Sequence, residues 1–252
     1  MNITLVAATI LFVCLVGAAL LGRRVRRYLP ENHLSADSKD AVKLAMGLVA
    51  TMTALVLGLL VSSAKGTYDT ARSEVIQMAA KIAFLDRVLG LYGPEAADAR
   101  VEFRAAIVEA VQRMWPSERS KSAQLAPNQQ VADAFYVAIQ RLSPRDDTQR
   151  ALKTEAATLM VDLAQLRSLL IAQSIPSISI PMLIILVSWL VVIFLGFSVL
   201  APPNATTTVA LIASAFSVAC AIFLILELDQ PFGGLIRIPS QPMVNVLSHL
   251  AK

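Results

Sequence analysis

The chain has 252 residues, of which 56% are hydrophobic and only 16% are charged, and its mean hydropathy is +0.63. This composition excludes a disordered chain and is too apolar for an ordinary soluble domain. The net charge of +4 comes from 22 basic and 18 acidic residues. Because the charged middle of the chain contains no basic patch, we expect no nucleic-acid partner.

Charged residues are absent from three stretches of the chain, 1–22, 44–64 and 168–226. A helix that crosses the ~30 Å hydrocarbon layer needs about 20 apolar residues, so the first two stretches each fit one span and the third fits two. The sequence therefore predicts a multi-pass protein of the cell membrane, surrounded by lipid bilayer. Its four predicted transmembrane helices are Ile3–Leu21, Ala41–Ala64, Met182–Leu200 and Val209–Leu228.

The first span is predicted to be a membrane anchor and not a cleaved signal peptide. A signal peptide carries positive charge before its apolar core, whereas here the basic residues follow the core. We expect these arginines to attract anionic lipid headgroups. They are Arg23, Arg24, Arg26 and Arg27. Cys14 and Cys220 both lie within spans, which favours buried small side chains over a disulfide or a metal site.

The second span is predicted to continue beyond the membrane as one long helix. No proline occurs between Pro30 and Pro94, and apolar residues keep helical spacing from Thr67 to Leu91. A helix of about fifty residues would be ~75 Å long at 1.5 Å per residue.

Residues 65–175 hold 27 of the 40 charges, 14 basic and 13 acidic, which predicts a module outside the membrane. Helix-start signals occur at Pro94, Asn128 and Ser143–Asp147, and no alternating strand pattern is present. The expected fold class is all-α, with a helical bundle inserted between spans two and three. The expected parts are residues 1–64 with spans one and two, 65–175 with the bundle, 176–228 with spans three and four, and a C-terminal tail, 229–252.

Basic residues in short loops set the orientation of a membrane protein. The loop from Arg23 to Lys43 contains six of them, and none precedes span one. This asymmetry predicts that the loop is cytoplasmic and that both termini and the bundle lie outside.

No sequence motif predicts an enzyme, because a Gly-rich phosphate loop, a Gly-x-Ser-x-Gly turn and a cysteine pair are all missing. The only histidines, His33 and His249, lack nearby carboxylates at metal-ligand spacing. We therefore expect no catalytic residue, no metal and no cofactor.

The second span carries a stripe of small and hydroxyl residues between two lysines. Its members are 4, 4, 3, 4, 4 and 3 residues apart, so they share one face of a helix, while leucines occupy another face. The stripe consists of Lys43, Gly47, Thr51, Ala54, Gly58, Ser62 and Lys65. Two interpretations stand with equal weight: a packing seam between helices, or the wall of a water-filled path.

The fourth span has a shorter pattern of the same kind, which includes Ser214 and Ser217. Glu227 and Asp229 follow at its end, either as an ordinary interface anchor or, repeated around an oligomer, as an acidic ring that selects cations. The lysines of span two would attract anions instead, so the sequence leaves the ion open. Phe232, in a Pro-Phe-Gly-Gly turn, is expected at the level of the lipid headgroups.

Several separated motifs resemble the bestrophin-like membrane proteins of bacteria. They are Gly58–Lys65 with Tyr68-Asp69, Leu85-Asp86-Arg87, Tyr92-Gly93-Pro94-Glu95, Trp115-Pro116 and Leu228–Ile236. The resemblance implies a bacterial plasma membrane, a homo-oligomer of five copies, and a pore lined by the second span. Bestrophins have aromatic residues at the pore neck, whereas this second span has none. They also place the domain between spans two and three in the cytosol, opposite to the orientation that the basic loop predicts.

The leading functional hypothesis is an integral membrane homo-oligomeric channel or pore for inorganic ions, with span two along the pathway. The alternative is a non-conducting membrane scaffold or sensor whose helical bundle binds a partner.

Overall fold

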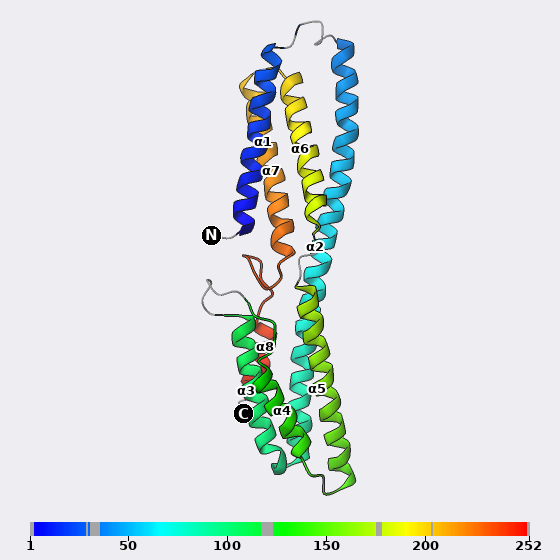
Figure 1. Cartoon of the computed structure of the whole chain (residues 1–252), viewed down its shortest axis with the longest axis vertical. Helices are drawn as coiled ribbons and strands as arrows, with labels where there is room; N and C mark the ends of the chain where they lie inside the picture. The colour runs from blue at the N-terminus through cyan, green and yellow to red at the C-terminus, as the bar shows by residue number, and fades with distance from the viewer. Residues whose placement is uncertain are drawn as a thin grey trace. The chain divides into compact units, whose positions relative to one another are not determined.

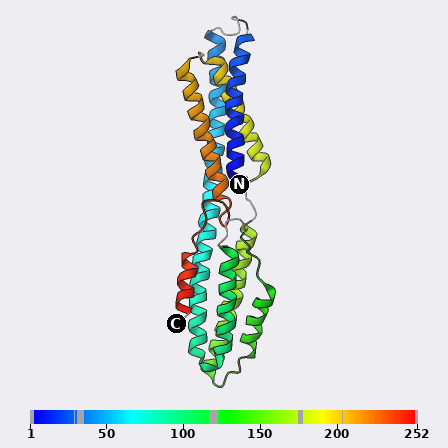
Figure 2. The same cartoon turned by 90° about the vertical axis from the view of Figure 1, so that its left-hand side faces the viewer.

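A computed structural model describes residues 3–28, 30, 36–116, 123–174, 178–202 and 204–250. Over these residues the chain forms eight α-helices and one short 3-10 helix, and no strand, which confirms the all-α class (Figures 1 and 2). The helices are α1 (Ile3–Tyr28), α2 (Ala36–Tyr92), η2 (Pro94–Ala96), α3 (Ala97–Met114), α4 (Gln129–Arg141), α5 (Asp147–Gln173), α6 (Ile180–Leu200), α7 (Ala205–Leu228) and α8 (Gln241–Leu250). Of these, α1, α2, α6 and α7 are long and apolar enough to span a membrane.

The second helix, α2, runs for 57 residues without interruption, which confirms the predicted long helix. It ends at Tyr92, where Gly93 has a φ of 112° that residues with a side chain rarely adopt. Pro94 then occupies the first turn of η2, where its missing N–H is not needed.

The predicted starts of α4 and α5 are also present. Asp146 caps α5 by accepting a hydrogen bond of 2.7 Å from the backbone N–H of Gln149. Asn128 precedes α4, but its side-chain amide donates to Glu109 Oε1 at 2.9 Å and does not cap the helix. The sequence did not predict α8. The polar sequence from Ser117 to Pro127 predicts a loop at the end of the bundle. Residues 117–122 of this segment and His33 lie outside the described residues.

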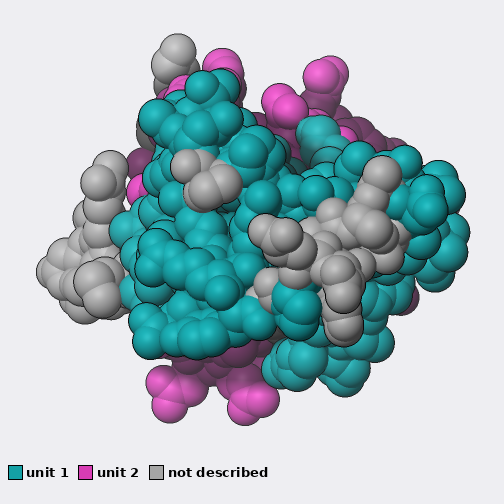
Figure 3. Space-filling model, turned by 90° about the horizontal axis from the view of Figure 1, so that it is seen from above, with its two compact units in different colours: residues 1–66, 176–229 teal, residues 67–175, 230–252 magenta. Residues whose placement is uncertain are grey.

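Two compact units divide the chain, and Figure 3 colours them separately. Unit 1 contains residues 1–66 and 176–229, and unit 2 contains residues 67–175 and 230–252. The helix α2 supplies its first part to unit 1 and its second part to unit 2.

Within unit 1, α1 packs against α6 and α7, and α2 also contacts α6. A Cβ added at Gly22 of α1 would lie 2.6 Å from the carbonyl oxygen of Leu195. Beside it, the hydroxyl of Ser198 donates to the carbonyl of Ala19. A Cβ at Gly196 would lie 2.6 Å from the sulfur of Met46 on α2. Small residues thus permit the close approach of membrane helices. Both cysteines are free and exposed on the protomer, not buried as expected.

Within unit 2, the second part of α2 packs with α3, α4, α5 and α8 around one apolar core. The largest fully buried side chains in it are those of Ile82, Leu85, Leu89, Phe103, Met114, Ile139, Leu170, Ile238 and Met243. Trp115 ties the C-terminal segment to this core by donating to the carbonyl of Ile238 at 2.8 Å.

Ion pairs also join the helices of unit 2. Lys81 of α2 pairs with Asp162 of α5 at 2.5 Å. Arg100 of α3 donates two hydrogen bonds of 2.9 Å to Asp86 of α2, and this carboxylate raises the pKa of Arg100.

Candidate functional site

The stripe of small residues on α2 is open to the surroundings along its whole length. Every one of its members, from Lys43 to Lys65, is exposed in the protomer. A different side of the same helix faces the protein, through Met46, Thr53, Leu60 and Ala64, and the leucine face is exposed as well, at Leu44, Leu48, Leu55 and Leu59. The helical periodicity that predicted the stripe is therefore present, and the stripe points away from the rest of unit 1.

The glycines of the stripe show what it contacts within one protomer. A Cβ added at Gly47 or at Gly58 would meet no atom within 4 Å. Gly22 and Gly196 differ, because helix packing leaves no room for a Cβ at either position. A packing seam inside one subunit therefore does not account for the stripe, which is left to face another copy, lipid or water.

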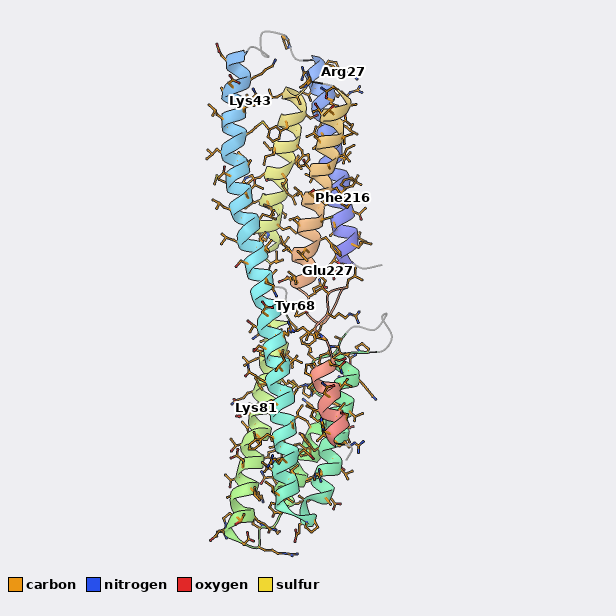
Figure 4. The ribbon with its side chains drawn as sticks, turned by 180° about the vertical axis from the view of Figure 1, so that it is seen from behind. Arg27, Lys43, Tyr68, Lys81, Phe216 and Glu227 are labelled. Atoms are coloured by element: carbon orange, nitrogen blue, oxygen red, sulfur yellow. The ribbon has the colours of Figure 1, made fainter. Side chains whose placement is uncertain are left out.

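Hydroxyl and charged groups of α2 have local partners. Thr51 donates to the carbonyl of Gly47 at 2.9 Å, a bond within its own helix. Lys43 pairs with Asp40 at 3.0 Å, and both are exposed. Figure 4 shows Lys43 and Arg27 near one end of unit 1 and Glu227 near the other.

The two serines of α7 are also exposed. Ser217 donates to the carbonyl of Ala213 in its own helix at 2.9 Å, while α7 packs through Ala215, Ala219 and Ile222. Among the described residues, no hydrogen bond joins Ser214 or Ser217 to the stripe on α2.

The carboxylates at the end of α7 are buried. Glu227 is 0% exposed and Asp229 is 4% exposed. The hydroxyl of Thr4, near the start of α1, donates to Glu227 Oε1. Within one protomer, the carboxylates therefore face protein, and Glu227 links the first and last helices of unit 1.

Thr4→Val should lower the free energy of unfolding by about 2 kcal/mol, because the buried carboxylate of Glu227 loses a hydrogen-bond donor. Unfolding in detergent, followed by circular dichroism, measures the difference. Thr9→Val is the matched control on α1, since Thr9 is exposed and bonds only to the carbonyl of Leu5 in its own helix. Equal losses in the two variants would show that the contact with Glu227 adds no stability.

The four arginines after the first span fall into two pairs. Arg23 donates to the hydroxyl of Thr208, and Arg26 donates to the carbonyls of Val199 and Ala201 at the end of α6. Arg24 and Arg27 are exposed and have no ion pair or hydrogen bond among the described residues. Among the described residues, Arg24 and Arg27 are thus the two of the four arginines without a protein partner, and they are the pair that we expect at lipid phosphates.

Arg24→Gln with Arg27→Gln should weaken the binding of phosphatidylglycerol to the detergent-solubilised protein by about 2 kcal/mol, at roughly 1 kcal/mol for each arginine. Titration with phosphatidylglycerol or phosphatidylcholine in mixed micelles, followed by native mass spectrometry, measures the preference. Arg26→Gln is a control that also removes an arginine charge. It should lower the thermal stability and leave the lipid preference in place, because Arg26 bonds to the end of α6. A preference that survives the double substitution would contradict a lipid role for this pair.

Phe232 is 7% exposed, and its ring packs in the core of unit 2 against Trp115, at a centroid distance of 6.0 Å. It is thus buried in protein and not exposed at the headgroup level that the sequence suggested. A turn of glycines and proline signals a bend, but it does not tell which core the aromatic ring enters.

No cluster of three His, Cys, Asp or Glu side chains suited to a metal ion occurs in the part of the chain that the structure describes. The sequence predicted the helix in the second part of α2 but no functional role for its surface, and it carries no signal that marks the surface between α3 and α4.

Solved structures share this fold over nearly the whole chain. A variant of a bacterial bestrophin homologue from Klebsiella pneumoniae has a TM-score of 0.72 at 16% identity, covering 99% of this chain and 97% of that chain. A second variant of that homologue has a TM-score of 0.71 at 15% identity, over 96% and 97% of the two chains. A structure described as a membrane protein has a TM-score of 0.71 at 15% identity, over 96% of each chain.

None of the curated proteins matches the chain by sequence. The family model of the Bestrophin-like domain matches residues 13–243, most of the chain. Three observations lead to the same family: the order of the motifs along α2 and after α7, the four apolar helices, and this match. The chain belongs to the Bestrophin-like family.

Proposed function

We propose that the protein is a homo-oligomeric ion channel in which the small-residue stripe of α2 faces the pathway. The observation that carries this proposal is that α2 exposes, beside its exposed leucine face, a second face made of small and hydroxyl residues, with no atom near the Cβ positions of Gly47 and Gly58. Small and hydroxyl residues leave room for water beside a membrane helix.

Several copies are needed, because one protomer presents the stripe on its outside and cannot enclose a path with it. Closed cyclic symmetry would repeat the stripe around an axis. The resemblance to bestrophins favours five copies. The solved relatives whose fold is shared are described as bestrophin homologues.

We further propose that the ion is an anion. The burial of Glu227 and Asp229 in the protomer favours a structural role for them over an acidic ring. The stripe carries two basic residues, Lys43, which pairs with Asp40, and Lys65, and rings of basic residues attract anions into a pore.

Planar-bilayer recording of the purified oligomer tests both statements. Under a potassium chloride gradient we expect unitary currents whose reversal potential moves toward the chloride equilibrium potential. A move toward the potassium potential would contradict the anion proposal alone. Silence under varied voltage, pH and tension, with intact oligomers confirmed, would contradict conduction and favour the scaffold hypothesis.

The orientation is a separate proposal: the loop from Arg23 to Lys43 is cytoplasmic and unit 2 is outside. Thr148→Cys, at an exposed position at the start of α5, reports on it in a chain whose Cys14 and Cys220 are replaced by alanine. An impermeant maleimide should label intact cells. Labelling only after lysis would place unit 2 in the cytosol, as in bestrophins.

A further inference from the structure

Within unit 2, α2 has an exposed apolar edge. Phe84 is 48% exposed and Leu91 is 65% exposed. These two residues are seven apart and therefore lie on the same side of the helix. Other large apolar side chains of unit 2 are exposed too, among them Ile76, Val161 and Leu169, so the pair gains its meaning from the charge beside it and from a complementary surface.

A free positive charge lies along this edge. Arg87 is exposed, three residues after Phe84 and four before Leu91. No ion pair or hydrogen bond of its side chain occurs among the described residues, whereas its neighbour Asp86 is bound by Arg100. The edge of α2 thus combines apolar contact area with an unpaired cation.

The complementary surface is a groove of about 720 Å³ between α3 and α4 in the same unit. Three carboxylates that line it, those of Asp98, Glu102 and Asp133, have no ion pair within the described chain. Apolar side chains lie among them, including Val101, which is 67% exposed. A fourth carboxylate, Glu95, is already paired with Arg145 at 2.7 Å.

The edge and the groove lie at the same level along the helices. The ion pair between Asp86 and Arg100 places the turn of α2 that contains Arg87 beside the turn of α3 between Asp98 and Glu102. In a ring whose symmetry axis is parallel to this part of α2, rotation from one copy to the next does not change the position of a residue along the axis. A neighbouring copy therefore presents its groove at the level of Arg87.

We propose that the edge of α2 formed by Phe84, Arg87 and Leu91 docks into the α3/α4 groove of the next copy of this chain. This inference rests on the homo-oligomer of the proposed function and assigns the surfaces that join its subunits. The two surfaces differ, so the contact is heterologous and a closed ring forms when the rotation closes.

A symmetric contact between two α2 edges fits the charges less well. It would bring Arg87 of one copy against the same arginine of the other, and like charges across an interface oppose association. The groove instead offers three unpaired carboxylates and one arginine, Arg141, to the incoming helix.

Cross-linking tests the contact directly. Phe84→Cys with Val101→Cys, in a chain without Cys14 and Cys220, should give a ladder of bands up to the full ring when a short bismaleimide is added to the purified oligomer. Phe84→Cys with Thr158→Cys is the matched control, because Thr158 is exposed on α5 and outside the groove. A ladder in the control as strong as in the first pair, no ladder in either, or dimers from Phe84→Cys alone would overturn the proposal.

Charge reversal gives an independent result. Arg87→Glu and Glu102→Arg should each raise the concentration at which the oligomer dissociates at least about ten-fold, and the two together should restore most of the loss. Arg104→Glu, an equal change at an exposed position of α3 outside the groove, should have little effect. Single reversals without effect, or a combination as weak as the single variants, would contradict the interface. If the oligomer fails these tests but conducts ions, the interface proposal is wrong and the channel proposal stands. If the oligomer cross-links as expected but conducts no ions, the channel proposal is wrong and the interface proposal stands.

Discussion

Gly58→Leu is expected to lower the single-channel conductance at least about ten-fold while the oligomer stays intact, because a bulky side chain would enter the pathway once in every copy. The protomer has space for the change, since no atom lies within 4 Å of the added Cβ. Size-exclusion chromatography with mass measurement checks assembly, and bilayer recording checks the current.

The same substitution separates the two interpretations of the stripe. If the stripe packs tightly against another copy, leucine at position 58 prevents assembly, because close helix approach needs small residues. Ala45→Leu is the control: Ala45 is exposed on the same helix but lies outside the stripe. Loss of the oligomer in Gly58→Leu, with a normal Ala45→Leu oligomer, would contradict the pathway and support a seam.

Gly22→Ala is expected to destabilise unit 1 by about 3 kcal/mol, the upper part of the usual range for overpacking. The new methyl group would lie 2.6 Å from the carbonyl oxygen of Leu195 and 2.9 Å from the Cβ of Ser198. The first of these is a backbone atom, so relief requires α1 and α6 to move apart. That movement would also lengthen the bond from Ser198 to the carbonyl of Ala19.

Gly17→Ala provides the matched control on α1, because nothing lies within 4 Å of its Cβ position. It should be neutral or stabilise the protein by about 0.5 kcal/mol, since alanine favours a helix over glycine. Thermal unfolding in detergent compares the two variants with the unchanged chain. Equal midpoints for Gly22→Ala and Gly17→Ala would show that α1 and α6 do not approach as closely as described.

The sequence predicted the position of the arginine cluster Arg23–Arg27 but not the contacts of its individual side chains. Its position after an apolar span identified the end of a membrane helix, because charge and hydropathy act locally along the chain. It did not separate Arg26, which bonds to the end of α6, from Arg27, which is exposed. That difference depends on which helix packs beside α1, far away in the sequence.

The burial of Glu227 and of Phe232 was also not predictable from the sequence. A carboxylate at the end of a span and an aromatic residue in the next turn are both compatible with a membrane surface. The structure buries Glu227 against Thr4, 223 residues away in the chain, and Phe232 against Trp115. Such contacts have no periodic signal in the sequence.

The sequence by itself determined the four apolar spans, the all-α class, the continuous α2 and the existence of its small-residue stripe. Each of these follows from charge, hydropathy or period within one segment. Only the tertiary structure decided that the stripe is uncovered in the protomer, that Glu227 is enclosed, and that an acidic groove lies level with Arg87. The physical reason is that burial and alignment result from packing between segments distant in the chain, which a pattern within one helix does not specify.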